Sequence, residues 1–127
     1  MKLSTKGRYG LRAIVDLAVN QTQGAVSISS IAARQSLSEN YLEQLMSRLK
    51  KAELVCSVRG AQGGYHLAKR PADITVGMIL RATEGDLAPA ECVSMDGHAC
   101  TRSGVCPSHA VFAKVYSAIN NVIDGVT

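Results

Sequence analysis

The 127-residue sequence contains no tryptophan, one phenylalanine and four tyrosines, so aromatic residues make up only 4% of the chain. A hydrophobic core must therefore be built mainly from Leu, Ile, Val and Ala. The hydrophobic content of 46% is typical of a globular protein and not of a disordered one. A chain of this length is expected to form one domain.

The sequence also lacks an apolar run long enough to span a bilayer. Its first eight residues, MKLSTKGR, do not contain the apolar stretch of a signal peptide. We therefore expect a cytoplasmic protein with no membrane partner. In a reducing compartment its four cysteines are better interpreted as ligands or inert residues than as two disulfides.

Positive and negative charges are unevenly distributed along the chain. Residues 1–70 contain eleven Lys or Arg and four Asp or Glu, whereas residues 71–127 contain three and six. A basic first part beside an acidic second part indicates that the first part meets a polyanion such as nucleic acid. Ordinary surface charge that serves solubility is the alternative.

Three helices are predicted in the first part by apolar residues at helical spacing. The first covers residues 7–20, the second is a short helix that begins near Ile28, and the third follows Ser38 as its N-cap. Two short helices joined by a tight polar turn form a helix-turn-helix. The polar face of the third helix offers side chains that can bind base edges or phosphates. These are Glu39, Asn40, Glu43, Gln44, Ser47 and Arg48.

A β-hairpin is predicted directly after this third helix. Two strand-like runs, at residues 54–58 and 65–68, flank a glycine-rich turn. Arg59 begins the turn, and Gly60 allows the backbone to approach a minor groove closely. The glycines do not match a nucleotide-binding loop, because no Lys-Ser/Thr follows them. A hairpin in this place is the wing of a winged helix.

Residues 71–127 predict two more helices, separated by a long polar loop. The fourth helix begins at Thr75 and ends near Gly85, and the fifth covers residues 108–123 after Pro107. The apolar stripe of the fifth helix is longer than a small winged helix needs. It packs either on its own chain or in a subunit interface, and we favour a homodimer because operators are commonly read by two-fold dimers.

The predicted fold is therefore mainly α-helical with a small β-hairpin wing. A winged helix-turn-helix DNA-binding region occupies residues 1–70, and dimerisation helices with a cofactor-binding loop at 92–109 occupy residues 71–127.

The loop contains three cysteines and a histidine with the spacing Cys92-x7-Cys100-x5-Cys106-x2-His109. Thiolates suit zinc, copper(I) and iron–sulfur clusters, and an imidazole can complete the set. Structural zinc sites usually include two ligands separated by two to four residues, which only Cys106 and His109 satisfy. The wider gaps are compatible with a cluster. Spacing alone favours neither zinc nor a cluster.

Other donors lie in the same loop, namely Glu91, Asp96 and His98. An enzyme with a cysteine nucleophile beside His98 or His109 is a further alternative. We disfavour it because no oxyanion-type or substrate-pocket feature accompanies these residues. We expect no catalytic residue and no small-molecule substrate.

Several segments carry a family resemblance: LSTKGRY at residues 3–9, YLEQL at 41–45, LV at 54–55, VRG at 58–60 and GGY at 63–65. Together with the cysteine loop, they make the chain resemble the iron–sulfur cluster regulator (IscR) type of the Rrf-type winged-helix transcriptional regulators, nearly from end to end. The motif RGxxGGY alone marks only the wider superfamily.

The resemblance implies a homodimer that holds one 2Fe–2S cluster per subunit through Cys92, Cys100, Cys106 and His109. It also implies DNA reading by Tyr41, Glu43, Gln44 and Arg59, with Glu43 as a selectivity gate. We predict DNA contacts at Asn40, Tyr41, Glu43, Gln44, Ser47, Arg48, Arg59, Gly60 and Tyr65.

Two branches of the Rrf-type family differ from this chain in the residues available to hold a cofactor. The nitric-oxide-sensing branch holds a 4Fe–4S cluster with three cysteines and an N-terminal aspartate. This chain has Arg8 at the position of that aspartate, and the nearest acidic residue, Asp16, lies at least a helical turn from it. The cysteine-metabolism repressors lack the cysteine triad. This chain departs from the iron–sulfur cluster regulator type in one respect. Seven residues separate its first two loop cysteines, Cys92 and Cys100, whereas the best-known pattern has five.

The sequence thus predicts a DNA-binding transcriptional regulator, preferably a repressor, controlled by a 2Fe–2S cluster that senses iron–sulfur status, redox state or nitric oxide. The alternatives are a regulator with a structural zinc or 4Fe–4S site, and a cluster-free repressor of the cysteine-metabolism type.

Overall fold

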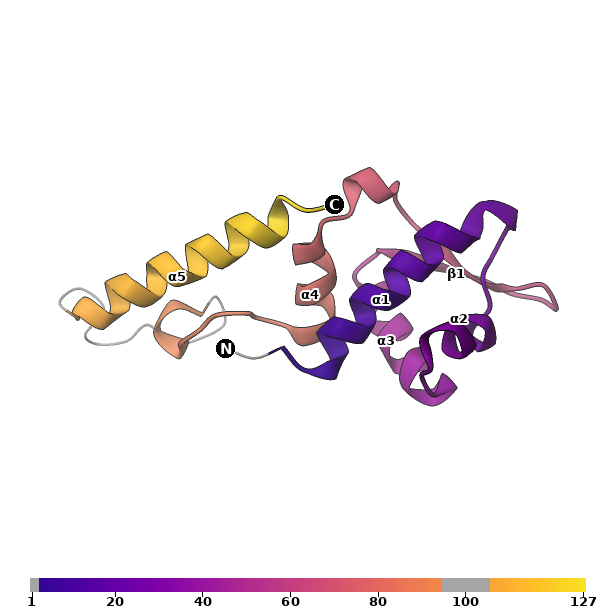
Figure 1. Ribbon diagram of the computed structural model, residues 1–127, viewed down its shortest axis with the longest axis horizontal. Coiled ribbons are helices and arrows are strands. Elements are labelled where there is room, and N and C mark those ends of the chain that lie inside the picture. The colour runs from indigo at the N-terminus through magenta and orange to yellow at the C-terminus, as the bar shows by residue number, and fades with distance from the viewer. Residues whose placement is uncertain (1–2, 95–105) are drawn as a thin grey trace.

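The computed structural model describes residues 3–94 and 106–127. Its elements follow the chain as α1 (Thr5–Asn20), η1 (Gln21–Gln23), α2 (Ile28–Gln35), α3 (Glu39–Lys51), β1 (Val55–Val58), β2 (Gly64–Leu67), η2 (Pro71–Asp73), α4 (Val76–Glu84), η3 (Glu91–Val93) and α5 (Pro107–Asp124), where η marks a short 3₁₀ turn. Helices α1 to α4 and the hairpin form one packed unit, and α5 extends away from it (Figure 1). The predicted winged helix-turn-helix with a long final helix is confirmed.

Each of the first four helices begins at a hydroxyl side chain that accepts a backbone N–H group. The caps are Ser4, Ser27, Ser38 and Thr75, which receive hydrogen bonds from Lys6, Ser30, Tyr41 and Met78 respectively. Such caps satisfy donors that the first helical turn leaves free. The predicted starts at Ser38 and Thr75 are confirmed, and α1 begins at Thr5 rather than at Gly7 because Ser4 caps it.

The core lies where α1, α2, α3, α4 and the hairpin meet. Its fully buried side chains include Leu17, Ile31, Leu42, Met46 and Leu49. Burying one such side chain stabilises the fold by about 1.5–3 kcal/mol. As predicted, the apolar stripe of α3 faces inward. Since Ile74 and Ile79 belong to the same core, α4 packs with the helices that precede it.

Helices α1 and α4 approach closely because two glycines of α1 face α4. A Cβ atom on Gly10 would lie 2.6 Å from Cγ2 of Thr83, and one on Gly7 would lie 2.8 Å from Oε1 of Glu84. Thr83 is fully buried, and its hydroxyl group donates to the carbonyl of Ile79 at 2.9 Å. No larger residue fits at either glycine unless α4 moves away.

An ion pair between a buried carboxylate and an exposed arginine, which the sequence pattern did not predict, joins α1 to α2. Asp16 is only 4% exposed, and its carboxylate accepts from Nε and Nη2 of Arg34 at 2.9 and 2.7 Å and from Nε2 of Gln35 at 3.0 Å. The hydrogen bonds from Arg34 outweigh the effect of burial and lower the pKa of Asp16 below its usual value. The pair fixes the first helix of the helix-turn-helix on α1.

Helix α5 contacts the rest of the chain mainly through polar groups. Arg81 of α4 donates to both carboxylate oxygens of Asp124 at 2.8 Å and to Oδ1 of Asn120 at 2.9 Å. In the middle of the helix, Tyr116 donates to Asp86 at 2.7 Å. No residue of α5 is buried. None of the helices within 3–94 and 106–127 is both long and apolar enough to cross a bilayer.

The Asp16–Arg34 pair predicts a pH-dependent loss in an Asp16→Asn variant. Hydrogen bonds to a charged group contribute about 1.5–3 kcal/mol, and we expect that loss in the free energy of unfolding at pH 7. Because the folded-state pKa of Asp16 is lowered, the contribution is complete above the unfolded value of about 3.9 and is lost as the pH falls below it. Urea unfolding from pH 7 to 3 measures the difference. A difference that stays constant over this range would contradict the assignment, and Asp73→Asn, in an exposed pair with Arg70, is the control.

Candidate nucleic-acid interface and cysteine loop

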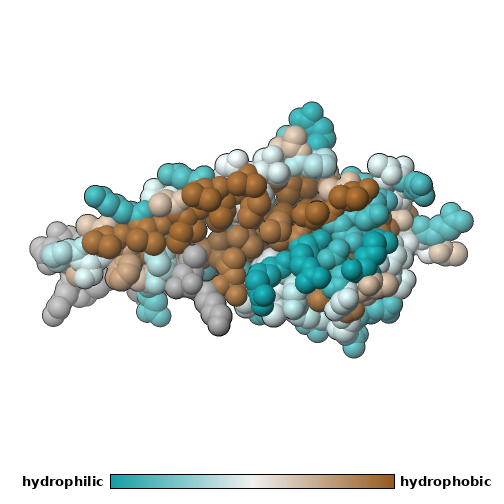
Figure 2. Space-filling view, viewed as in Figure 1, coloured by the Kyte–Doolittle hydropathy of each residue, from teal (hydrophilic) through white to brown (hydrophobic). Residues whose placement is uncertain are grey.

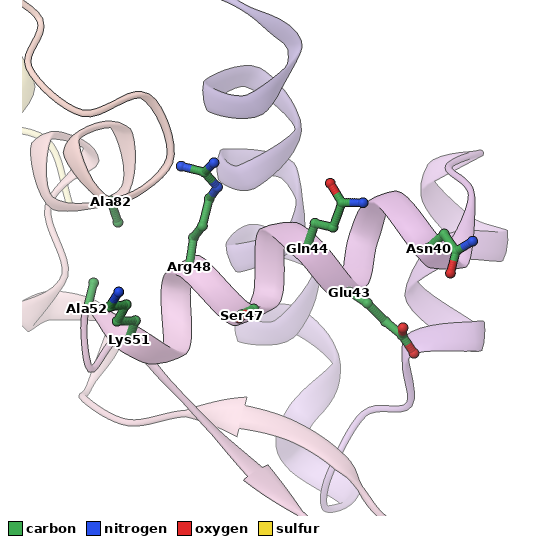
Figure 3. A pocket seen from close by; sticks show the side chains of 8 residues that line it. All are labelled: Asn40, Glu43, Gln44, Ser47, Arg48, Lys51, Ala52 and Ala82. Atoms are coloured by element: carbon green, nitrogen blue, oxygen red, sulfur yellow. The ribbon is translucent and has the colours of Figure 1, made fainter.

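The polar face of α3 is open, as predicted. Five of the predicted contact residues and Lys51 line a groove on this face (Figure 3). Ala52, directly after α3, and Ala82 of α4 close the groove at one end. The five are Asn40, Glu43, Gln44, Ser47 and Arg48, and every one of them is exposed. Basic residues gather in the last turn of α3, where they also complement the helix dipole. Lys50 extends this basic end toward the hairpin by donating to Oγ of Ser57 at 2.8 Å.

Tyr41 occupies a different place from the other predicted residues of α3. It is half-buried, and its hydroxyl group lies 2.6 Å from Oγ1 of Thr5 in α1. Its ring packs edge-to-face on Tyr9, with the two centroids 6.0 Å apart. The guanidinium of Arg12 stacks over the Tyr9 ring at 5.1 Å. Tyr41 therefore joins the start of α3 to the start of α1.

The hairpin presents Arg59 and Gly60 at its exposed turn. Near the turn, strand β2 is held by two backbone hydrogen bonds of 2.8 Å between Tyr65 and Val26. The ring of Tyr65 is half-buried and packs on the core, so this residue anchors the wing in the fold. Gly64 allows that anchor, because its φ is 153° and a Cβ there would lie 2.2 Å from the carbonyl oxygen of Val26.

Three of the four predicted cofactor ligands lie within the described residues. Cys106 is the residue before α5, His109 lies in the first turn of that helix, and Cys92 lies in η3, which packs against α5. Cys100 is outside the described residues. Within 3–94 and 106–127, no three His, Cys, Asp or Glu side chains come close enough to hold a metal ion.

Cys106 and His109 nevertheless have the properties of ligands. The backbone N–H group of His109, and after it that of Ser108, lower the pKa of the Cys106 thiol and so favour the thiolate. Nδ1 of His109 is buried and has no hydrogen-bond partner in the described part of the chain. A buried nitrogen left in this way costs free energy that a bound metal would recover. The residues present therefore fit a metal or cluster.

Asp16 is not available as an N-terminal acidic ligand. Its carboxylate is occupied by Arg34 and Gln35, and it lies in the core contact between α1 and α2. Of the other donors in the loop, Glu91 is exposed, whereas Asp96 and His98 lie outside the described residues.

Sequence reasoning missed Glu84, the last residue of α4. Its Oε1 accepts hydrogen bonds from the backbone N–H of Ser4 at 2.9 Å, from Oγ of Ser4 at 2.6 Å and from the backbone N–H of Gly7 at 2.8 Å. Burial alone would raise its pKa, but the hydrogen bonds from Ser4 and Gly7 hold the pKa below its usual value. The one signal in the sequence was a glycine near the start of a helix.

Comparison with known proteins gives a consistent picture. The Rrf2 family, described as iron-dependent transcriptional regulators, matches residues 3–127. The HTH-type transcriptional regulator IscR of Aliivibrio salmonicida is 39% identical over the whole chain, which spans 74% of that relative. The structure of T. potens IscR is 46% identical, with a TM-score of 0.79 over all of this chain and 82% of that one. The structure of CymR, titled the global cysteine regulator of B. subtilis, is 42% identical, also with a TM-score of 0.79, over all of this chain and 92% of that one.

The wing anchor predicts that two glycines of positive φ differ in their tolerance of alanine. At Gly60 a Cβ meets nothing within 4 Å, so Gly60→Ala should cost only the backbone strain of about 1–2 kcal/mol. Gly64→Ala adds a clash with Val26, and we expect it to lower the free energy of unfolding more and to make the hairpin a site of proteolysis. Urea unfolding and limited trypsin digestion measure both effects. Equal losses in the two variants would contradict the role of Gly64.

Proposed function

The chain belongs to the Rrf2 family of transcriptional regulators, and we propose that it represses transcription as a cytoplasmic homodimer whose operator binding is controlled by a 2Fe–2S cluster. Its relatives are transcriptional regulators rather than enzymes. The observation that supports the cluster is the pair Cys106 and His109 at the start of α5. A favoured thiolate there lies three residues before a buried imidazole nitrogen that has no hydrogen-bond partner among the described residues.

DNA reading is assigned to α3 and the wing. The exposed side chains of Asn40, Gln44 and Arg48 are suited to base edges and phosphates of a major groove. Glu43 can accept a hydrogen bond from the amino group of cytosine, and as an anion it disfavours a site that offers only acceptors. Arg59 and Gly60 at the wing turn are suited to an adjacent minor groove. Ser47, Tyr41 and Tyr65 complete the proposed interface, the last two chiefly by holding α3 and the wing in position.

The second copy is proposed to cover the exposed apolar side chains of α5. Val111, Val115 and Val122 are 57, 41 and 66% exposed, and Val15 and Val19 of α1 are 53 and 68% exposed. Figure 2 shows apolar side chains gathered along α5 and α1 on one face. Monomeric proteins rarely leave a contiguous apolar surface of this kind uncovered. In a two-fold dimer, which presents the same surface twice, each copy covers the other.

The proposed ligands of the cluster are Cys92, Cys100, Cys106 and His109. When bound, a 2Fe–2S cluster supplies a redox-active centre that is also sensitive to iron supply. The thiolate of Cys106 and the imidazole of His109 are both placed by the first turn of α5. Cys92 comes from η3 on the other side of the loop. Capture of one centre by these residues therefore fixes the end of the loop against α5. In this division of labour, residues 1–70 read DNA and residues 71–127 hold the cluster and the second copy.

Overall similarity does not separate the two kinds of regulator, because identity to CymR is 42% and identity to the two IscR proteins is 39 and 46%. The cysteine triad with His109 favours cluster control over the cluster-free alternative, for which thiols at these positions would have no role. The 4Fe–4S alternative with an N-terminal aspartate is disfavoured by the burial of Asp16 against Arg34. Zinc remains the second candidate for the same four ligands.

Metal analysis tests the cofactor. Anaerobically purified protein should contain iron and sulfide in equal amounts, about two of each per chain, and should absorb visible light. Cys106→Ser and His109→Ala should lose most of both, whereas Cys56→Ser, at a half-buried strand position away from the loop, should retain them. Stoichiometric zinc without iron would support the zinc alternative. Protein free of metal would contradict both.

The DNA face is tested by variants with opposite expected results. Arg59→Ala should weaken operator binding by about 1–3 kcal/mol, and Arg59→Lys should restore only the part that depends on charge, which falls with added salt. Glu43→Ala should instead keep the affinity and broaden the set of sequences bound. Selection from a random-sequence duplex pool, followed by affinity measurement at fixed salt, gives both quantities. Unchanged affinity in Arg59→Ala together with unchanged preference in Glu43→Ala would contradict these assignments.

A further inference from the structure

The carboxylate of Glu84 acts as a cap for α1, although Glu84 lies 77 or more residues away along the chain. Its Oε1 receives three hydrogen bonds from Ser4 and Gly7, all of 2.9 Å or less. The first turn of α1 contains no acidic residue of its own. Glu84 therefore supplies the negative charge that the positive end of the α1 dipole favours. The contact is specific, because Gly7 is the residue whose missing Cβ leaves room for this carboxylate.

The same turn of α1 holds the start of the DNA-reading helix. Thr5 follows Ser4, and its Oγ1 lies 2.6 Å from the hydroxyl oxygen of Tyr41. Tyr41 lies between Asn40 and Glu43 along the first turns of α3, and the side chains of these two residues line the groove. A displacement of the α1 start relative to α4 would therefore be passed to the groups that contact DNA.

On its other side, Glu84 is where the chain leaves α4 for the cysteine loop. Gly85 follows with a φ of 84°, a conformation that favours glycine, and Asp86 then accepts a hydrogen bond from Tyr116 of α5 at 2.7 Å. Asp86 also accepts a hydrogen bond from Ser94, two residues beyond Cys92. The start of this segment is thus tied to α1 through Glu84 and to α5 through Asp86.

We propose that Glu84 is the positioning residue that couples the metal state of the cysteine loop to the placement of Tyr41 and α3. This inference rests on the proposed function and adds the residue through which the control is transmitted. A centre held by the proposed ligands would tie Cys92 to the start of α5 and would so shift the end of α4 relative to α5. The hydrogen bonds of Glu84 then carry the shift to α1 and α3. A ligand changes such an equilibrium only by binding one arrangement better than the other.

The test compares operator affinity in two forms of the full chain. A duplex selected from a random pool with the iron-loaded wild type serves as the probe, at fixed salt. We expect the affinities of the iron-loaded and chelator-treated wild type to differ by about 5-fold or more, within the range of allosteric coupling. In Glu84→Gln the ratio should fall to about 2-fold or less, with the iron content unchanged. Asp73→Asn, which neutralises an exposed carboxylate off this route, should keep the wild-type ratio.

A second variant separates transmission from folding. Thr5→Val removes the hydrogen bond to Tyr41 and leaves the Glu84 cap intact, so it should also lower the ratio of iron-loaded to chelator-treated affinity. This variant replaces Glu84→Gln as the test if Glu84→Gln does not fold. Variants that bind iron and keep the full wild-type ratio would overturn the role of Glu84. A wild-type ratio of one would instead overturn cluster control itself, and the transmission with it. The wild-type measurement therefore distinguishes the two failures.

Discussion

The close packing of α1 on α4 is the contact on which the other arrangements in this protein depend. Gly7 and Gly10 allow it, and Thr83 and Glu84 fill the space that the glycines leave. Helix α1 also holds α2 through Asp16 and α3 through Thr5. Gln21, the residue that caps the C-terminal end of α1, holds strand β2, because its Oε1 accepts from the backbone N–H of Leu67 at 2.9 Å. The elements proposed to read DNA are therefore placed by one helix, and that helix is placed by α4. The packing of α1 on α4 joins the parts before and after residue 70, to which different roles are proposed.

Helix α5 is held by a different kind of contact. Arg81 with Asp124, and Asp86 with Tyr116, fix its direction through charged and hydrogen-bonded groups, while its apolar side chains remain exposed. Polar contacts at a surface contribute little to stability but are sensitive to direction. A second copy on the apolar face would supply the missing burial. Of the segments with proposed ligands that the structure describes, η3 packs against α5 and Cys106 directly precedes it.

Local features of this fold were readable from the sequence, and long-range polar ones were not. Hydroxyl caps at Ser38 and Thr75, the apolar stripe of α3 and the glycine-rich wing are local patterns, and the structure confirms them. Asp16 and Glu84 were missed because periodicity treats a charged residue as exposed, and their partners on other helices lie 18 and 77 or more residues away. The resemblance to the Rrf-type regulators is confirmed by the family match. The individual DNA contacts and the four cluster ligands stay predictions.

The most direct test of the account is amide hydrogen exchange, followed by mass spectrometry, in iron-loaded and metal-free protein. If capture of a centre by the cysteine loop is transmitted through α4, iron should slow exchange near Cys92 and in the first turn of α5. It should also slow exchange in the first turns of α1 and α3, which lie far along the chain from the ligands. Slower exchange confined to the loop and α5, with α1 and α3 unchanged, would contradict the account.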